Sequence, residues 1–359
     1  MSLIKKILNL SIFLIIINLS NAQSSKVLKG NLPLPSLLLP DDNISDWENN
    51  RVKIQKRILT SWGVGPIELT SKNEFHIYKS FEINGLKVIE YRYQVYGNHF
   101  DQGYLVLPKN FNSQKKYKCF VAIHGSNKSL GGYQTIDTTN APNRAYAFDM
   151  ATKGYIAFAP SLFDFGDTLL TTSQDSIRNN LIKQYPDWTI VGRQMYGLKR
   201  SLDMLDQLPF IKTSSYILMG HSLGGRNALY LAALDKRIKA TVISAGVSPS
   251  HSNIYRGLKR NASFQPKFWN DVKNNGRYPW EVNEMIALVA PNPLLFIEPY
   301  NDPSNPFTGH TVQAFNSSQE VWRLYNTESD FSVYLHGDGH DTQPYIKRFA
   351  YNWLIERDN

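Results

Sequence analysis

One short stretch, residues 216–233, constrains the fold of this chain more than any other. The apolar run Tyr216-Ile217-Leu218-Met219 passes directly into the turn Gly220-His221-Ser222-Leu223-Gly224, and a helical segment rich in alanine and leucine follows. Glycines on both sides of such a turn permit the close approach of a strand and a helix, while the central residue takes a strained backbone conformation. The stretch therefore predicts a buried strand and a helix joined by a sharp turn that presents the Ser222 hydroxyl to open space.

Short apolar runs alternate with helical patterns from Lys118 onward. This alternation is typical of a mostly parallel sheet with helices on both faces, and it predicts an α/β fold. The predicted strands cover residues 119–123, 155–159, 216–219, 240–244, 294–297 and 331–335. The predicted helices include 195–205, 346–354 and one that ends at Lys153-Gly154, where glycine permits a left-handed stop. Before this region, extended segments at 75–83, 86–95 and 103–107, with a turn at Asn84-Gly85, predict antiparallel hairpins.

The first 22 residues have the pattern of a secretory signal. Lys5 and Lys6 precede an apolar stretch over residues 7–19, and Ser20-Asn21-Ala22 supplies small residues before Gln23. The apolar stretch is short for a membrane span. We therefore expect export to the periplasm or the extracellular space, and a product with no stable membrane anchor.

Three parts are expected along the chain: the signal at 1–22, an N-terminal extension at 23–74 and an α/β catalytic domain at 75–359. The extension contains a predicted helix, because Ser45-Asp46-Trp47-Glu48 has capping-box spacing and apolar residues follow at helical intervals until Gly63. An insertion at about 249–281 interrupts the alternation of strands and helices. Its aromatic residues suit either a substrate-binding cap or simple packing against the body of the domain.

Composition excludes several other classes of protein. The chain has 359 residues, of which 42% are hydrophobic, so it can bury a large core. Its net charge of +9 would fall to +7 without Lys5 and Lys6, and the remaining basic residues are scattered with no nucleic-acid-binding pattern. Cys119 is the single cysteine and follows the pattern of a core thiol, so an internal disulfide is excluded. We expect no nucleic-acid partner.

His340 is the candidate base for Ser222. A serine hydroxyl becomes a nucleophile when an imidazole removes its proton, and chains with this turn place an acid and then a histidine after the serine. His340 lies in a loop between the last predicted strand and the last predicted helix. We interpret the competitors His221, His310 and His336 as structural. Two glycines between His336 and His340 argue against a helix that would pair them as metal ligands, so we expect no metal.

Two carboxylates compete for the role of the acid that orients the histidine. Glu298 stands at the end of the predicted strand 294–297, and Asp302 lies in the Asn-Asp-Pro turn beyond it. We favour Asp302, because a carboxylate in a loop can reach the histidine, hold its tautomer and stabilise the imidazolium.

Acyl transfer also needs hydrogen-bond donors for the developing oxyanion, and two backbone amides are the candidates. The first belongs to Leu223, directly after the serine. The second belongs to Ser126 in His124-Gly125-Ser126, which follows the first parallel strand, and Asn127 is the alternative. We interpret His124 as a residue that braces this loop.

These residues resemble the dienelactone-hydrolase and acetyl-xylan-esterase-like branch of the α/β-hydrolases, which includes secreted esterases. The resemblance extends from Gly103 onward and rests on the segments 124–126, 220–225, 232–240 and 290–295, on Asp302 and on Gly339-His340. It implies an α/β-hydrolase fold, an aspartate at the position of Asp302 and an oxyanion amide at Ser126. Because the family commonly has a bulkier residue where Ser126 stands, the resemblance also implies an acyl pocket of different shape.

The sequence thus predicts a serine carboxylic-ester hydrolase that acts through an acyl-enzyme, with the triad Ser222, Asp302 and His340 and with no cofactor. The substrate would be a small-molecule or glycan ester, with an acetylated carbohydrate as one candidate, and no substrate-binding residue is identified. A peptidase or lipase with the same triad remains an alternative. So does a non-catalytic relative that binds a glycan or a protein.

Overall fold

The computed structural model describes residues 34–66, 72–166, 172–249, 265, 267–268, 278–305 and 307–358. The predicted signal at 1–22 and most of the predicted insertion at 249–281 lie outside the described residues. Residues from Ser36 onward form one unit, and the predicted N-terminal helix is part of it. The division of the chain at residues 22 and 74 stays a prediction.

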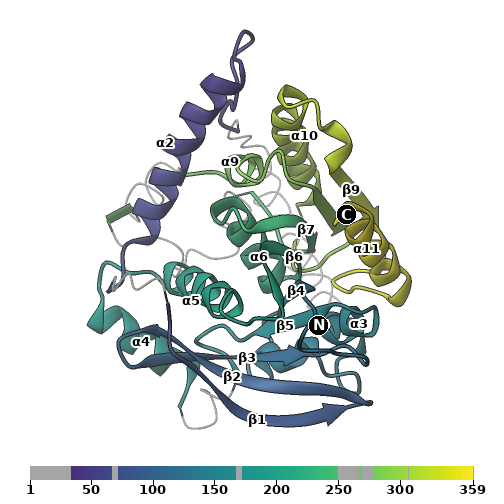
Figure 1. The fold of residues 1–359 in the computed structure, drawn as a ribbon. Coiled ribbons are helices and arrows are strands. Elements are labelled where there is room, and N and C mark those ends of the chain that lie inside the picture. Colours follow the sequence, from purple (N-terminus) through teal and green to yellow (C-terminus); the bar gives the residue numbers. More distant parts are fainter. Residues whose placement is uncertain are drawn as a thin grey trace, which may run out of the picture. The chain divides into compact units, whose positions relative to one another are not determined.

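Nine strands in the described part of the chain form one sheet, in the order β1-β2-β3-β5-β4-β6-β7-β8-β9 (Figure 1). From β5 to the β9 edge all neighbours are parallel, whereas β1, β2 and β3 extend the sheet by antiparallel pairing onto β5. The strands are β1 (Phe75–Ile83), β2 (Leu86–Tyr96), β3 (His99–Val106), β4 (Tyr117–Ile123), β5 (Ile156–Pro160), β6 (Ile211–His221), β7 (Ile238–Ser244), β8 (Leu294–Pro299) and β9 (Phe331–His336). This arrangement confirms the predicted α/β fold class.

Helices cover both faces of this sheet (Figure 1). Alternate side chains of β8 point to opposite faces of the sheet. Leu295 and Ile297 pack in a core with residues of α3 and α11. On the other face, the ring centroid of Phe296 lies 4.2 Å from that of Phe315 on α10. The helices are α2 (Ile44–Trp62), α3 (Tyr146–Thr152), α4 (Gln174–Gln184), α5 (Ile190–Leu205), α6 (Leu223–Leu234), α9 (Val282–Ala287), α10 (Thr308–Leu324) and α11 (Pro344–Arg357), with 3-10 turns η1 (Gly131–Thr135), η2 (Pro142–Arg144) and η5 (Glu328–Asp330). Among the described helices, none is long and apolar enough to cross a membrane.

The sequence patterns located these elements well and their ends less well. All six predicted parallel strands are present, although β6 begins five residues before the predicted segment. The hairpin turn is confirmed, since Asn84 and Gly85 have φ values of 45° and 79°. The predicted stop after α3 is also confirmed, because Gly154 has a φ of 96°. The helices α4, α9 and α10 were not among those predicted.

The start of α2 corrects one prediction. Asn43, rather than Ser45, is the N-cap residue: its side chain accepts hydrogen bonds from the amides of Ser45 and Asp46. The Asp46 carboxylate in turn accepts the amide hydrogen of Asn43, which completes a capping box two residues earlier than the predicted one.

The C-terminal end of α2 is packed against the body of the protein through aromatic rings. Trp62 is buried, and its ring centroid lies 5.2 Å from that of Tyr230 on α6 and 6.1 Å from that of Trp280. Trp280 belongs to the predicted insertion, is 6% exposed and donates from Nε1 to the hydroxyl of Ser61 at 3.0 Å. For Trp280, these contacts support the packing interpretation.

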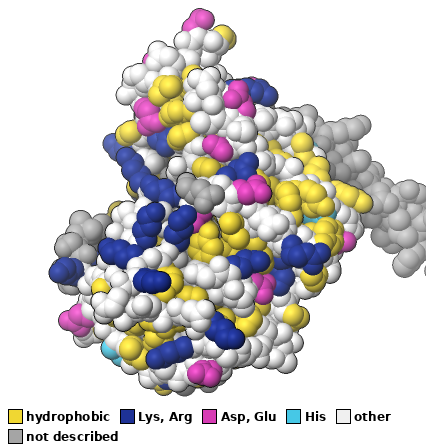
Figure 2. Space-filling view, turned by 45° about the vertical axis from the view of Figure 1, so that its right-hand side comes forward, with side chains coloured by type: hydrophobic (Ala, Val, Ile, Leu, Met, Phe, Trp, Pro, Cys, Tyr) yellow, Lys and Arg dark blue, Asp and Glu magenta, His cyan; other side chains and the backbone are white. Residues whose placement is uncertain are grey.

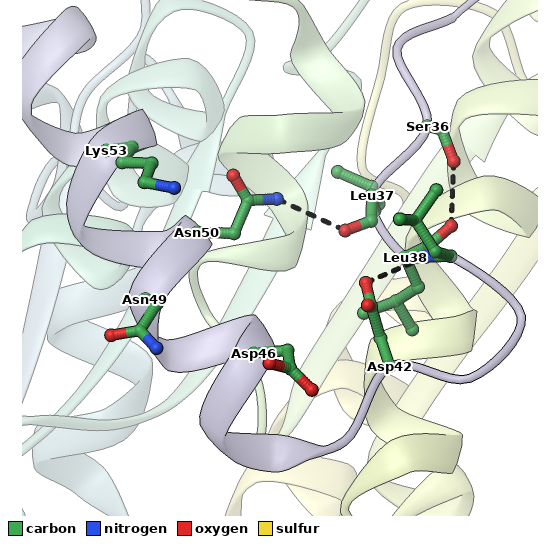
Figure 3. Close-up of a pocket in the computed structure, with 9 residues that line it drawn as sticks. Ser36, Leu37, Leu38, Asp42, Asp46, Asn49, Asn50 and Lys53 are labelled. Atoms are coloured by element: carbon green, nitrogen blue, oxygen red, sulfur yellow. Dashed lines mark hydrogen bonds between the residues drawn. The ribbon is translucent and has the colours of Figure 1, made fainter.

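A polar hollow of about 370 Å³ lies at the opposite end of α2, between this helix and residues 36–42 (Figure 3). Asn50 donates to the carbonyl oxygen of Leu37 across it, and Asp42 and Asp46 accept backbone amides that fix the start of the helix. These side chains hold the chain segment before α2 in place, and the lining contains none of the predicted catalytic residues.

Basic side chains occupy several separate places on the face shown in Figure 2, with acidic and apolar side chains between them. Several basic residues are neutralised by neighbouring carboxylates; Arg237, for example, pairs with Asp203, Asp206 and Asp235 at 2.7 to 2.8 Å. The scattered charge predicted from the sequence is visible on this face.

Candidate active site

The turn at Ser222 has the strained geometry that the sequence predicts. Strand β6 ends at His221, helix α6 begins at Leu223, and Ser222 between them has φ 58° and ψ −120°. An L-residue rarely adopts a positive φ, so the neighbouring structure must hold it there. One contact that stabilises this conformation is a hydrogen bond of 2.8 Å from the amide of Ser222 to the carbonyl oxygen of Ser244 at the end of β7.

Glycines let the turn lie directly against the neighbouring strands. A Cβ atom on Gly224 would stand 2.0 Å from the carbonyl oxygen of Ile123 at the end of β4. A Cβ on Gly220 would stand 2.2 Å from the carbonyl oxygen of Gly224, and one on Gly225 would stand 3.0 Å from the Cα of Gly246. The backbone contacts leave no room for side chains at these positions, which explains the glycine pattern of the sequence.

Asp302 and His340 meet as predicted. Nδ1 of His340 lies 2.7 Å from Oδ2 of Asp302, which is 3% exposed. The second oxygen of Asp302 accepts the amide hydrogen of Ser304 at 2.6 Å. Burial raises the pKa of Asp302, but the hydrogen bonds from His340 and Ser304 lower it by a larger amount. The net pKa therefore lies below the ordinary value. Asp302 is therefore an ionised acceptor that holds the proton of His340 on Nδ1.

Glu298 has a different environment, although it belongs to the same chain segment. Its side chain is fully buried at the end of β8, and Oε1 accepts the amide hydrogen of Gly246 at 3.3 Å. Burial raises its pKa well above the ordinary value, and the negative charge of Asp302 raises it further. Burial therefore favours the neutral form of Glu298. In the described part of the chain His340 bonds to Asp302, and Glu298 bonds to the backbone of Gly246.

The other histidines of the sequence analysis have structural contacts. His221 is 2% exposed, and its ring centroid lies 4.7 Å from that of His340. His336 ends β9, and its Nδ1 accepts the amide hydrogen of Asp338 at 3.3 Å. His310 lies in the first turn of α10, where its ring stacks on Phe307 with centroids 6.0 Å apart. Because His340 adjoins the residue before Ser222, the candidate base and nucleophile lie at the same edge of the sheet.

The candidate oxyanion loop is braced by His124, as predicted. The Nε2 atom of His124 accepts the amide hydrogen of Leu162 at 3.0 Å, so the ring proton is on Nδ1 and is donated to the carbonyl oxygen of Gly125 at 2.6 Å. The carbonyl and the N–H of a trans peptide point in opposite directions. His124 thus orients the N–H of Ser126 away from itself. Asn127 uses its side chain within the loop, as acceptor for the amide of Leu130 at 3.2 Å.

Leu223 is the first residue of α6, so its amide has no acceptor within the helix. The Ser126 loop lies against the Ser222 turn, since a Cβ on Gly125 would stand 3.6 Å from the carbonyl oxygen of His221. The two segments that carry the candidate amides therefore lie side by side, and the role of these amides as oxyanion donors stays a prediction.

A group of polar residues around His221 was missed by sequence reasoning. Its members come from three separate parts of the chain: Asn143, Arg144, Ser244, Asp341 and Thr342. Asn301 was also missed, and its side chain bonds to both Gly337 and Gly339 at the start of the His340 loop. The one signal in the sequence was the position of Asp341 and Thr342 directly after His340.

The described residues contain no cluster of three His, Cys, Asp or Glu side chains that could hold a metal ion. Both nitrogens of His124 and His221, and Nδ1 of His340, are engaged by protein groups instead.

Comparison with known proteins confirms the predicted resemblance. Residues 132–259 match the model of the dienelactone hydrolase family. An Aspergillus terreus protein named as dipeptidyl-peptidase 5 is 30% identical over 159 residues, which is 43% of this chain and 19% of the fungal protein. The chain thus spans about a fifth of the length of that relative.

Solved structures share the fold. A glucuronoyl esterase from Solibacter usitatus has a TM-score of 0.72 with 15% identity over 90% of this chain and 98% of its own. A Bacteroides fragilis protein described as an acetyl xylan esterase has a TM-score of 0.63 with 16% identity over 86% of this chain and 79% of its own. At these identities the likeness establishes the α/β-hydrolase fold. The family match and the fold together support a hydrolase.

Replacing Gly224 should destabilise the protein. In Gly224→Ala the new Cβ meets backbone atoms that cannot swing aside, 2.0 Å away at Ile123 and 2.6 Å away at His124. We expect the free energy of unfolding, measured by urea denaturation, to fall by about 1–3 kcal/mol or more. Gly309→Ala is the matched control, because its Cβ meets nothing within 4 Å in α10, and it should be neutral or stabilising. Equal stability of the two variants would contradict the packing argument.

The protonation of His124 should make stability depend on pH. Burial lowers the pKa of His124 from 6.5 to about 4. The unfolded chain therefore binds more protons between these two values, and the free energy of unfolding should decrease as pH falls, by up to ~1.4 kcal/mol per pH unit from this residue. Urea denaturation at several pH values in this window should give a shallower slope for His124→Asn. An unchanged slope would refute the assignment.

Proposed function

We propose that this chain is a serine carboxylic-ester hydrolase that acts through an acyl-enzyme intermediate. The observation that carries the proposal is the hydrogen bond of 2.7 Å between His340 and Asp302, at the same sheet edge as a turn that holds Ser222 at φ 58°. A strained serine, an imidazole with its Nδ1 proton held and an ionised carboxylate form the arrangement that activates a serine hydroxyl.

In the proposed reaction, Ser222 Oγ attacks the ester carbonyl and Nε2 of His340 takes the hydroxyl proton. Asp302 keeps the other ring proton on Nδ1 and stabilises the imidazolium that forms. The tetrahedral intermediate breaks its bond to the alcohol, which leaves with the proton from His340. Water then attacks the acyl-enzyme by the same route and releases the acid and free Ser222.

The negative charge of the tetrahedral intermediate needs donors, and we assign this role to the amides of Leu223 and Ser126. One such donor typically lowers the barrier by about 3 kcal/mol. The support for Ser126 is the orientation that His124 gives to its peptide, and the support for Leu223 is its place at the first position of α6.

We propose a carbohydrate ester as the substrate class. The support comes from the structural neighbours described as glucuronoyl and acetyl xylan esterases, and from the export pattern of residues 1–22, which would place the protein where such polymers occur. A peptidase is the second candidate, since the fungal relative named as dipeptidyl-peptidase 5 is 30% identical over 159 residues. Purified protein should be tested on acetylated xylan, a methyl ester of glucuronic acid and a dipeptide anilide. The substrate with the highest kcat/KM decides between a carbohydrate esterase and a peptidase.

Ser222→Ala should abolish hydrolysis. Loss of the nucleophile typically lowers kcat by about 10⁶-fold, so the variant should show no turnover of 4-nitrophenyl acetate above background. The wild-type protein, but not Ser222→Ala, should also be labelled covalently by a fluorophosphonate. Ser113→Ala, in an exposed turn before β4, is the control and should keep full activity. Equal rates for wild type and Ser222→Ala would sink the proposal.

The two carboxylates should differ sharply when replaced. Asp302→Asn removes the charge that holds the His340 proton, and kcat should fall by about 10³–10⁴-fold. Glu298→Gln replaces one neutral buried group with another of similar shape, and kcat should change less than about tenfold. Both variants are compared at matched thermal stability. A larger loss in Glu298→Gln would transfer the role of the acid to Glu298.

A further inference from the structure

The side chain of Arg144 joins the Ser222 turn to the His340 loop. Arg144 ends the turn η2, and its side chain is 16% exposed. Nη1 donates to Oδ1 of Asp341 at 2.6 Å. Nη2 donates to Nε2 of His221 at 3.1 Å and to the carbonyl oxygen of His340 at 3.2 Å. One guanidinium thus connects the residue before the candidate nucleophile with the candidate base and the residue after it.

These contacts fix the proton on the His221 ring. A guanidinium only donates, so Nε2 of His221 accepts, and the single proton of the neutral ring is on Nδ1. That proton is donated into a pair of hydroxyls, Ser244 Oγ at 3.0 Å and Thr342 Oγ1 at 3.1 Å. Burial, followed by the charge of Arg144, lowers the pKa of His221 well below the ordinary value, so the ring stays neutral. His221 is therefore a rigid spacer between Arg144 and the end of β7.

The His340 loop is held from two sides. Asp302 holds the imidazole ring, whereas Arg144 holds the main-chain carbonyl of the same residue and the carboxylate of Asp341. Asn143 and Gln343 also donate to that carboxylate, each at 2.8 Å. Loss of Arg144 would leave the ring bound to Asp302 and would release the backbone of His340 from the turn that carries Ser222.

We propose that Arg144 is a positioning residue that sets the placement of the His340 imidazole relative to Ser222. In this role it acts through His221, Asp341 and the His340 backbone and makes no contact with the substrate. The inference rests on the proposed serine-hydrolase function. Reacting groups must approach to about 3–3.5 Å, and a displacement of about 1 Å can cost 100-fold in rate.

The experiment compares Arg144→Ala and Arg144→Lys with wild type in 4-nitrophenyl acetate hydrolysis, with and without added guanidinium ion below unfolding concentrations. We expect kcat of Arg144→Ala to fall by about 10–100-fold while KM changes less than about threefold. Guanidinium should restore part of the lost kcat, because it can occupy the site of the deleted group. Arg144→Lys should remain impaired, since an ammonium cannot reproduce the planar fork. Arg348→Ala, on the exposed side of α11, is the matched control and should behave as wild type.

The outcomes separate this inference from the proposed function. If the wild-type protein neither hydrolyses the ester nor is labelled by a fluorophosphonate at Ser222, the proposed function fails first. If wild type is active and a folded Arg144 variant keeps wild-type kcat, the positioning role is wrong. A loss of kcat in Arg144→Ala that guanidinium does not restore would also overturn the positioning role. The loss would then be an indirect effect of lower stability. If Arg144→Ala does not fold, Arg144→Gln replaces it in the same comparison.

Discussion

The backbone strain at Ser222 is the constraint on which the rest of the site depends. A positive φ at a serine costs free energy, of order 1–3 kcal/mol, that the turn alone cannot supply. Packing against the neighbouring strands offsets this strain. These contacts require glycine on the helix side of the turn, where Gly224 lies against the end of β4 and Gly225 lies against Gly246 after β7. These contacts bring the carboxyl ends of β4, β6 and β7 to one place. The loops that follow those strands therefore gather around the serine hydroxyl.

Much of this arrangement is encoded locally and could be predicted. Each parallel strand is a short apolar run, and the parallel order requires that all of their carboxyl ends meet at one edge. A loop that follows a strand must then begin at that edge, which is why His340 and Asp302 could be chosen from their positions alone. The order of parallel strands thus predicts which residues lie near one another. It led to the choice of His340 and Asp302, whose side chains are 2.7 Å apart in the structure.

The residues that the sequence did not reveal share one property, which is that their partners are distant. Arg144 bonds to residues 77, 196 and 197 positions away, and it lies in a short 3-10 turn with no motif of its own. The start of α2 was misplaced for a different reason. Two polar residues there, Asn43 and Ser45, both have suitable side chains, and the choice depends on how residues 36–42 approach the helix. Local patterns contain neither kind of information.

The environments of Glu298 and Asp302, rather than their positions in the sequence, determine which carboxylate carries the negative charge. Glu298 and Asp302 lie four residues apart, and both were plausible acids from the sequence. In the structure they influence each other, because two negative charges so close together and so deeply buried would repel. Hydrogen bonds favour the charged form of Asp302, so it remains ionised. At Glu298 burial outweighs the two amide donors, Gly246 and Val247, and favours the neutral form. The end of β8 thus presents a single negative charge, and that charge faces the histidine.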